Sequence, residues 1–197
     1  MKDFWNERYD GEQFVYGLTP NTFFKQFIDT HNSGTILLPA DGEGRNSIYA
    51  AKKGWQVDAF DFSEEAKKKA LNLADQEGIK INYYISDFES VELPDSHYDV
   101  VALIYAHMPS NIRQSIHRKL SDSLKSGGYI IMEAFAKDQI NRSSGGPKNR
   151  DMLYSVEDIK KDFETLDIQQ LEQTTVKLDE GKHHQGEGEV IRLRAKK

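Results

Sequence analysis

Short apolar runs alternate along the chain with segments whose apolar residues recur at helical spacing. Apolar runs followed by amphipathic segments are typical of βαβ units, whose strands form a parallel sheet. The order predicts five such strand-then-helix units. The predicted strands are residues 35–38, 56–60, 79–86, 99–105 and 129–135. Helical spacing or capping predicts helices at residues 43–53, 63–77, 109–124 and 155–163.

The last part of the chain follows a different pattern. Two strand-like segments, residues 168–178 and 189–195, flank a polar turn between Gly181 and Gly188 and can pair as an antiparallel hairpin. Residues 1–33 precede the sheet and predict a flexible arm plus a helix from Thr19 onward, while residues 138–148 predict an exposed loop. We therefore expect an α/β fold with an open, mostly parallel seven-stranded sheet and helices on both faces. Residues 1–197 are expected to form a single domain.

Composition excludes several classes of protein. The chain has 197 residues, of which 38% are hydrophobic, so it can bury a core. Its 26 Lys and Arg against 32 Asp and Glu give a net charge of −6, without the basic face that nucleic-acid binding requires. No apolar stretch is long enough to span a bilayer, and the first residues lack a signal-peptide core. The absence of cysteine excludes disulfides, a thiolate nucleophile and cysteine-ligated zinc. A cytoplasmic protein without an obligate partner is expected.

Candidate ligand-binding residues follow four of the predicted strands. They are the run from Ala40 to Gly44, then Asp61, Asp87, and the run from Tyr105 to His107. In open α/β sheets, ligands bind at the carboxyl ends of the strands. Asp61 lies 19 residues beyond Gly42, a separation at which an acid can accept hydrogen bonds from ribose hydroxyls. These features together predict a nucleoside-containing cofactor.

Two classes of cofactor compete for this loop. A dinucleotide would place its pyrophosphate at the helix N-terminus, where nearby acids are unfavourable. Asp41 and Glu43 flank Gly42 at that point, and Ser47 stands where a third glycine would be. The sequence therefore favours a cofactor with a cationic sulfonium and an ammonium group over an anionic pyrophosphate.

With these residues, the sequence resembles the class I S-adenosylmethionine-dependent methyltransferases, in particular the tellurite-resistance and thiopurine-methyltransferase-like branch. The resemblance covers essentially the whole chain and implies a Rossmann-like fold. It rests on Phe4-Trp5-Asn6-Glu7-Arg8-Tyr9, Tyr16-Gly17, Pro20-Asn21, Gly42-Glu43-Gly44-Arg45-Asn46, Asp61-Phe62-Ser63, Asp87-Phe88, Lys125-Ser126-Gly127-Gly128, Gly145-Gly146-Pro147, Leu153-Tyr154-Ser155 and His184-Gln185-Gly186.

The resemblance also implies roles for individual residues, with S-adenosylmethionine as the cofactor. Residues implied in cofactor binding are Ala40, Asp41, Gly42, Glu43, Gly44 and Asn46 at the methionine and ribose, Asp61 and Phe62 at the ribose, Asp87 and Phe88 at the adenine, and Ile104 and Tyr105 along the cofactor. Residues implied at the substrate or in a lid are Trp5, Tyr9, Tyr16, Arg45 and His184. The chain departs from the family pattern at two positions: Leu38 replaces the usual acid and Ala40 the usual glycine. Asp41 is a candidate replacement for that acid.

Several residues have a structural interpretation beside the functional one. The aromatic residues of the arm can pack on the sheet edge or form a lid over the sulfonium, whose charge aromatic faces attract. Asp87 can be a turn acid. His183 and His184 lie among acids, but a polar hairpin tip explains them better than a metal site. His107 is either a loop residue or a group that orients or deprotonates the acceptor.

We expect methyl transfer to a small-molecule acceptor, with a soft nucleophile such as a thiol, selenium or tellurium species. Such an acceptor needs little help from a general base, and His107 is the one candidate base that the strand ends present. Two alternatives stay open at this point. One is a non-catalytic S-adenosylmethionine-binding or partner-binding protein on the same fold, since fold alone does not establish activity. The other is an NAD(P)-dependent oxidoreductase.

Overall fold

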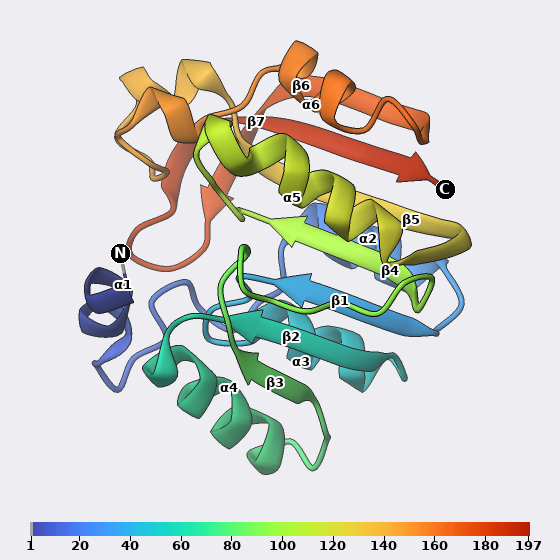
Figure 1. Ribbon diagram of the computed structural model, residues 1–197. Helices are drawn as coiled ribbons and strands as arrows, with labels where there is room; N and C mark the ends of the chain where they lie inside the picture. Colours follow the sequence, from blue (N-terminus) through green and yellow to red (C-terminus); the bar gives the residue numbers. More distant parts are fainter. Residues whose placement is uncertain (1) are drawn as a thin grey trace.

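Seven strands form one sheet in residues 2–197, the part of the chain that the computed structural model describes (Figure 1). The strand order is β3-β2-β1-β4-β5-β7-β6. The strands are β1 (Thr35–Pro39), β2 (Gln56–Asp61), β3 (Asn82–Ile85), β4 (Tyr98–Ile104), β5 (Leu124–Phe135), β6 (Asp167–Asp179) and β7 (Gln185–Lys196).

Strands β1 to β5 are parallel to one another, and β7 is antiparallel to both β5 and β6. The predicted C-terminal hairpin is therefore confirmed, and it joins the sheet through β7. The chain order reverses between β1 and β4, so the loops after these two strands border a crevice at the carboxyl edge. This fold is the Rossmann-like methyltransferase fold that the sequence predicts.

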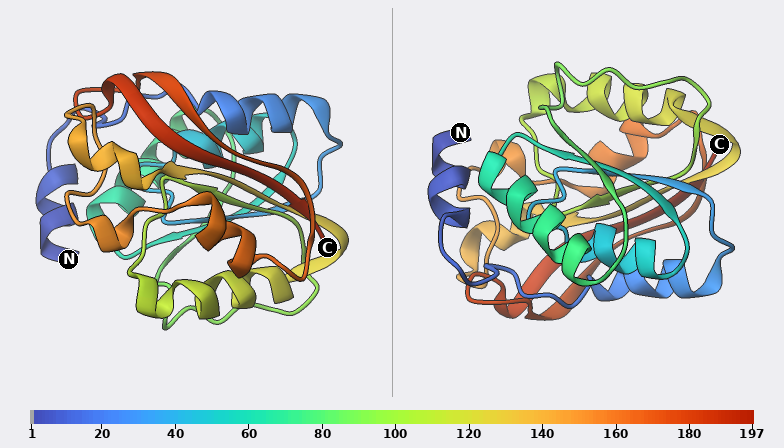
Figure 2. Two further views of the ribbon diagram at one scale, coloured as in Figure 1. Left: turned by 90° about the horizontal axis from the view of Figure 1, so that it is seen from above. Right: turned by 90° about the horizontal axis from the view of Figure 1, so that it is seen from below.

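Helices cover both faces of the sheet (Figure 2). On one face lie α2 (Thr22–Thr30), α3 (Arg45–Lys52) and α4 (Glu64–Gln76). On the other face lie α5 (Ser110–Asp122) and α6 (Val156–Asp162). The segment before the sheet adds α1 (Lys2–Tyr9), and two short 3₁₀ helices are η1 (Lys137–Asn141) and η2 (Arg150–Met152). Within the described residues, no helix is long and apolar enough to cross a membrane.

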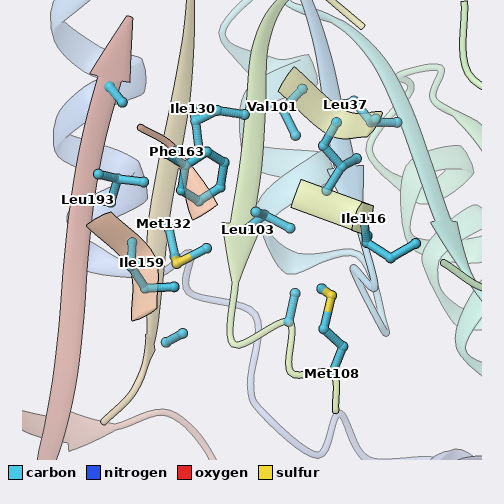
Figure 3. Packing of buried hydrophobic residues seen from close by; sticks show 14 of the residues in the cluster. Leu37, Val101, Leu103, Met108, Ile116, Ile130, Met132, Ile159, Phe163 and Leu193 are labelled. Atoms are coloured by element: carbon cyan, nitrogen blue, oxygen red, sulfur yellow. The ribbon is translucent and has the colours of Figure 1, made fainter. Parts of the chain in front are cut away.

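Apolar side chains from the two faces form two buried clusters. Strand β4 contributes to both, because its successive side chains point to opposite faces and nearly all of them are buried. Leu103 packs beneath α5 and α6, whereas Ala102 faces α2 and α3. Figure 3 shows the first cluster, where Ile116 of α5 and Ile159 of α6 meet the sheet. Each such aliphatic side chain contributes about 1.5–3 kcal/mol on burial.

Local sequence signals explain where the helices begin. Ser63 caps α4 by accepting from the Ala66 amide, as expected from the sequence. Ser155 and Asp158 form a reciprocal capping box at α6, so the short helix starts at a defined residue.

Three expectations about elements were wrong. The third strand has no helix after it: β3 ends at Ile85, and residues 86–97 return to β4 through turns and irregular backbone. The predicted helix 109–124 ends at Asp122, because β5 already begins at Leu124. The N-terminal arm contains helix α1, whose mean hydropathy is low and whose sequence carries little apolar periodicity. Contact with α4, rather than an apolar stripe, accounts for its place.

Three segments distant in sequence meet at the carboxyl edge of the parallel strands. Helix α1, the loop after β1 and the β6–β7 turn lie together at the left of Figure 1. A carbon atom added at Gly181, in that turn, would lie 2.2 Å from the Val15 carbonyl oxygen. The arm and the hairpin tip are therefore in direct backbone contact above the crevice.

Candidate active site

The loop after β1 makes a tight turn into α3. Ala40, Gly42 and Gly44 all adopt positive φ angles of 52°, 60° and 90°. A carbon atom added at Gly44 would lie 2.7 Å from the Ala70 Cβ, so glycine is required there for α3 and α4 to approach. Ala40 adopts the left-handed conformation without being glycine, which explains how the chain accommodates this departure from the family pattern.

Asp41 lies inside this turn with its charge unsatisfied. Both carboxylate oxygens are buried and accept no hydrogen bond from residues 2–197. Burial raises the pKa of Asp41 to about 7; Ser47 and the charge of Arg45 oppose this shift, and the charge of Asp61 adds to it. An unpaired buried carboxylate is costly unless a cation or donor reaches it. The position is therefore suited to a ligand ammonium or sulfonium.

Asp61 ends β2, the neighbouring strand, and faces the same turn. Its Oδ2 accepts from the Gly42 amide at 3.1 Å, and its Oδ1 accepts from the Ser63 amide at 2.9 Å. Burial raises the pKa of Asp61 to about 6, against these backbone hydrogen bonds. Tyr83 of β3 supports the turn by donating to the Gly42 carbonyl at 2.6 Å. The two carboxylates of Asp41 and Asp61 thus line one side of the glycine turn.

The other predicted cofactor residues lie around this turn in different settings. Asp87 follows β3, and its Oδ1 accepts from the Glu89 and Ser90 amides at 3.0 and 2.7 Å, which is the geometry of a turn acid. Phe88 packs edge-on against Phe60. Phe62 is partly exposed after β2. These side chains border the carboxyl edge of β2 and β3.

Strand β4 delivers Ile104 and Tyr105 to the same edge. Ile104 is buried, while Tyr105 is partly buried and adopts a φ of 53°, unusual for an aromatic residue. Asn46, at the start of α3, accepts from the Asn21 amide at 3.0 Å and so anchors the start of α2.

The N-terminal arm is fastened over the glycine turn. Glu43 accepts from the Val15 amide at 2.7 Å and pairs with Lys69 at 2.8 Å, and Lys69 also donates to the Gln13 carbonyl at 2.9 Å. Tyr9 is buried, with its hydroxyl 2.8 Å from where a Cβ at Gly42 would stand. Trp5 stacks on Tyr9 with ring centroids 5.4 Å apart. The aromatic side chains of the arm therefore lie against the turn.

A network of charged side chains occupies the opposite side, toward β5 and the hairpin. Glu133 of β5 is buried and accepts from Asn21 at 2.6 Å, Tyr105 at 2.9 Å and Arg192 at 2.6 Å. Glu180 in the hairpin turn accepts from Asn21 at 3.3 Å. Asn21 thus joins the two carboxylates.

Arg45 and His184 complete this network. Arg45 donates to Glu180 at 3.1 Å and reaches the Tyr16 and Thr19 carbonyls at 3.5 and 3.4 Å. His184 bonds to Glu180 through Nδ1 at 3.1 Å, and its ring lies 4.6 Å from that of Tyr16. The structure brings together the predicted substrate or lid residues Tyr16, Arg45 and His184.

His107 is placed differently from the expectation. Its Nδ1 bonds to the Met152 carbonyl at 2.7 Å, and its Nε2 accepts from the Phe135 amide at 3.2 Å. Burial lowers the pKa of His107 to about 4. Both ring nitrogens are therefore occupied by backbone groups. The neutral ring connects β5 to the segment before α6. It has no free nitrogen that could take a proton from a substrate.

Comparison with known proteins adds the chemistry of the fold. Residues 36–128, which run from β1 through the start of β5, match a protein family described as a methyltransferase domain. The matched segment is just under half of the chain. The unpaired carboxylate of Asp41 and the glycine turn fit a cofactor that carries two cationic groups.

Solved structures of low sequence identity share this fold. TehB from Haemophilus influenzae superposes with a TM-score of 0.76 at 14% identity, covering 100% of this chain and 66% of that one. Magnesium protoporphyrin IX methyltransferase from Synechocystis, solved with bound S-adenosylmethionine, gives 0.69 at 19% identity over 100% and 94%. A structure from a study of disulfide-to-thioacetal conversion during echinomycin biosynthesis gives 0.80 at 14% identity over 99% and 88%.

A curated relative also resembles the chain in sequence. The ribosomal protein L11 methyltransferase of Campylobacter concisus is 28% identical over 136 residues, which is 69% of this chain. The chain spans less than half of that relative, 43% of its length.

Sequence reasoning missed the acidic and amide groups of the network. Glu133 is the clearest case, because a lone carboxylate inside the apolar run 129–135 must find partners when it is buried. Glu180 is one of the acids near His183 and His184, and nothing in the local sequence indicates that it contacts Arg45. No group of three or more potential ligands in residues 2–197 is arranged to hold a metal ion.

Proposed function

We propose that the enzyme transfers the methyl group of S-adenosylmethionine to a small-molecule acceptor with a soft nucleophile, such as a thiol, selenium or tellurium species. The observation that carries the cofactor geometry is the unpaired, buried carboxylate of Asp41 in the turn after β1. Asp41 takes the place of the acid that the family pattern has three positions earlier, where this chain has Leu38. Its carboxylate accepts hydrogen bonds from the ammonium group of the cofactor.

The remaining cofactor contacts follow the strand ends. Asp61 accepts from the ribose hydroxyls with the carboxylate lone pairs that the Gly42 and Ser63 amides leave available. Phe62, Asp87 and Phe88 border the adenine at the neighbouring strand end. Ile104 and Tyr105 lie along the cofactor from β4.

Residues 1–33 act as a lid. The contacts of Glu43 with Val15 and Lys69 close the arm over the glycine turn, and Tyr9 packs against that turn. These contacts must open for the cofactor to enter. Once the arm closes, Trp5, Tyr9 and Tyr16 place aromatic faces near the sulfonium, where a cation is stabilised, and exclude water.

The soft acceptor follows from what the chain supplies. The cofactor provides a carbon already activated for in-line displacement, so the protein mainly aligns the two reactants, which supplies roughly 7–11 kcal/mol. The structure from the study of disulfide-to-thioacetal conversion, a reaction at sulfur, shares this fold.

A panel of acceptors tests this proposal. Purified enzyme is incubated with isotopically labelled S-adenosylmethionine and, separately, with mercaptoethanol, selenite, tellurite, catechol and a lysine-rich peptide. We expect labelled product from the sulfur, selenium or tellurium acceptors and little from catechol or peptide. Preferred transfer to the peptide, the chemistry that the ribosomal protein L11 relative suggests, would contradict the soft-acceptor proposal.

A further inference from the structure

We propose that His184, oriented by Glu180, is the general base that removes the proton from a thiol or selenol acceptor during methyl transfer. This inference rests on the proposed function and narrows its substrate class. It selects acceptors that carry a dissociable proton and disfavours oxyanions, which need no base.

The geometry defines which nitrogen is available. Nδ1 of His184 lies 3.1 Å from the Glu180 Oε2. Because a carboxylate only accepts hydrogen bonds, Nδ1 carries the proton, and Nε2 of the neutral ring presents a lone pair. Nε2 makes no hydrogen bond with any residue from 2 to 197, unlike the ring nitrogens of His107. His184 is therefore the histidine at this edge with a free basic nitrogen.

Glu180 is held so that it fixes the imidazole. Its Oε2 also accepts from Arg45 at 3.1 Å, and its Oε1 accepts from Asn21 at 3.3 Å. Although burial opposes ionisation, the hydrogen bond from His184 and the charge of Arg45 hold the pKa of Glu180 at about 2. A carboxylate anchored on both oxygens restricts the orientation of the ring. Glu180 is thus a positioning residue.

The surroundings of His184 keep the ring neutral and able to accept a proton. Burial lowers its pKa, the charges of Arg45 and Arg8 lower it further, and only Glu180 opposes them. Above its ordinary value of about 6.5 the imidazole is therefore unprotonated. Other ionisable groups near it are Tyr16, whose ring is 4.6 Å away, Tyr105, 4.7 Å away, and His107 and His183, whose pKa values a charge on His184 lowers.

The place of the ring is suited to an acceptor site. Tyr105 comes from the end of β4, the strand that borders the cofactor crevice, and Phe135 lies 5.2 Å from the imidazole edge-on. Gly145 packs closely against the imidazole, since a Cβ there would lie 2.6 Å from the His184 Cδ2 and 3.3 Å from Nε2. Aromatic walls with one free nitrogen accommodate an apolar thiol better than a hydrated oxyanion.

The step balances as a proton transfer coupled to displacement. The acceptor's S–H or Se–H bond breaks, its proton moves to Nε2, and the electron pair stays on the chalcogen. That pair forms the new bond to the methyl carbon, while the carbon–sulfur bond of the donor breaks and its electrons remain on the departing thioether. A thiol with a pKa of about 8.5 is mostly protonated at neutral pH, so the base increases the reactive fraction.

Two thiols separate base catalysis from alignment. Mercaptoethanol is protonated at neutral pH, whereas 4-nitrothiophenol is already ionised. In single-turnover assays, His184→Ala should lower the rate with mercaptoethanol by about 10²-fold or more and leave that with 4-nitrothiophenol close to wild type. His183→Ala is the matched control, because His183 is adjacent but exposed, and both rates should be retained. An equal loss with both thiols would overturn the proposal.

A second measurement does not depend on activity or on a folded variant. Nitrogen-15 imidazole spectra of the wild-type enzyme should show His184 as the tautomer protonated at Nδ1, with an unprotonated Nε2 at pH 7. If His184→Ala is unstable, the single-turnover assays with the two thiols are repeated with His184→Asn, which retains a polar group. A proton on Nε2 would overturn the base assignment. Absence of transfer to either thiol by wild type would instead contradict the proposed function, while the spectrum still tests the dyad.

Discussion

At the scale of single residues, Asp41 is the proposed replacement for the acid that the family pattern has where this chain has Leu38. Leu38 is buried within β1, where its side chain packs in the core below α2 and α3. Asp41 lies three residues later, and its carboxylate oxygens are equally removed from solvent. The sequence identified Asp41 as a replacement because it stands beside glycine. Its burial depends on Asp61 and the packing of α4, which the local sequence does not encode.

His107 carries the clearest prediction at this scale. Its pKa of about 4 lies below the usual 6.5, so between these values the unfolded chain binds a proton that the folded protein does not. The contribution of His107 to stability is therefore present above pH 6.5 and is lost as the pH falls toward 4. We expect His107→Ala to lower the unfolding free energy at pH 7 by about 1–3 kcal/mol through lost backbone hydrogen bonds.

Denaturant unfolding of wild type and His107→Ala across pH 4–7 measures this effect. The gap between the two proteins should narrow as the pH falls, while methyl transfer per folded molecule at pH 7 stays near wild type. His97→Ala, at an exposed histidine, serves as control. If His107→Ala kept the stability of wild type but lost most of its turnover, His107 would take part in methyl transfer instead.

The residue types were easier to predict than the directions of their side chains. Asp61 ends a strand whose neighbours are also parallel, so its place at the crevice follows from topology. His107 lies beyond the end of β4, so the irregular backbone after the strand, and not the strand itself, sets the direction of its side chain. Contacts with Met152 and Phe135, distant in sequence, decide it.

At the scale of elements, the N-terminal arm depends on a buried ion pair. Glu43 bonds to the Val15 amide and pairs with Lys69. A hydrogen bond to a charged group contributes about 1.5–3 kcal/mol, so Glu43→Gln should raise deuterium uptake in residues 2–17 by about tenfold or more. Added S-adenosylhomocysteine should lower the uptake in wild type.

Hydrogen exchange with mass spectrometry reads out this change. Glu77→Gln is the matched control, because Glu77 pairs with Lys52 at an exposed site where an ion pair contributes little. Its arm should exchange as in wild type. If hydrogen exchange in the arm were the same in Glu43→Gln as in wild type, the contacts of Glu43 would not be what holds the arm closed.

Element boundaries were predicted best where one signal dominates. The glycine at position 54 and the cap at Ser63 separate β2 from its neighbouring helices, and both agree with the structure. The prediction of a helix after β3 was wrong, because it extended the strand-then-helix alternation of the other units to residues 86–97, which have no helical periodicity. Helix α1 lacks an apolar stripe and is explained by its contact with α4.

At the scale of the whole molecule, alternation of strands and helices was enough to predict the sheet, its parallel part and its terminal hairpin. It was not enough to predict the convergence of α1, the glycine turn and the hairpin tip, which lie far apart in the sequence (Figure 1). Contacts such as Arg45 with Glu180 join residues 135 positions apart. The proposed cofactor side of the site follows from topology, whereas the proposed acceptor side depends on these long-range contacts.

In the proposed site, the turn after β1 binds a cationic cofactor through Asp41. Calorimetric titration of S-adenosylmethionine and NAD⁺ into wild type and Asp41→Asn tests it most directly. We expect S-adenosylmethionine to bind wild type and NAD⁺ not to bind, because Asp41 and Glu43 disfavour a pyrophosphate at this turn. Loss of a charge-assisted contact of about 1.5–3 kcal/mol should weaken S-adenosylmethionine binding to Asp41→Asn at least about tenfold. Equal affinity in a folded Asp41→Asn protein, or binding of NAD⁺ in preference to S-adenosylmethionine, would contradict the account.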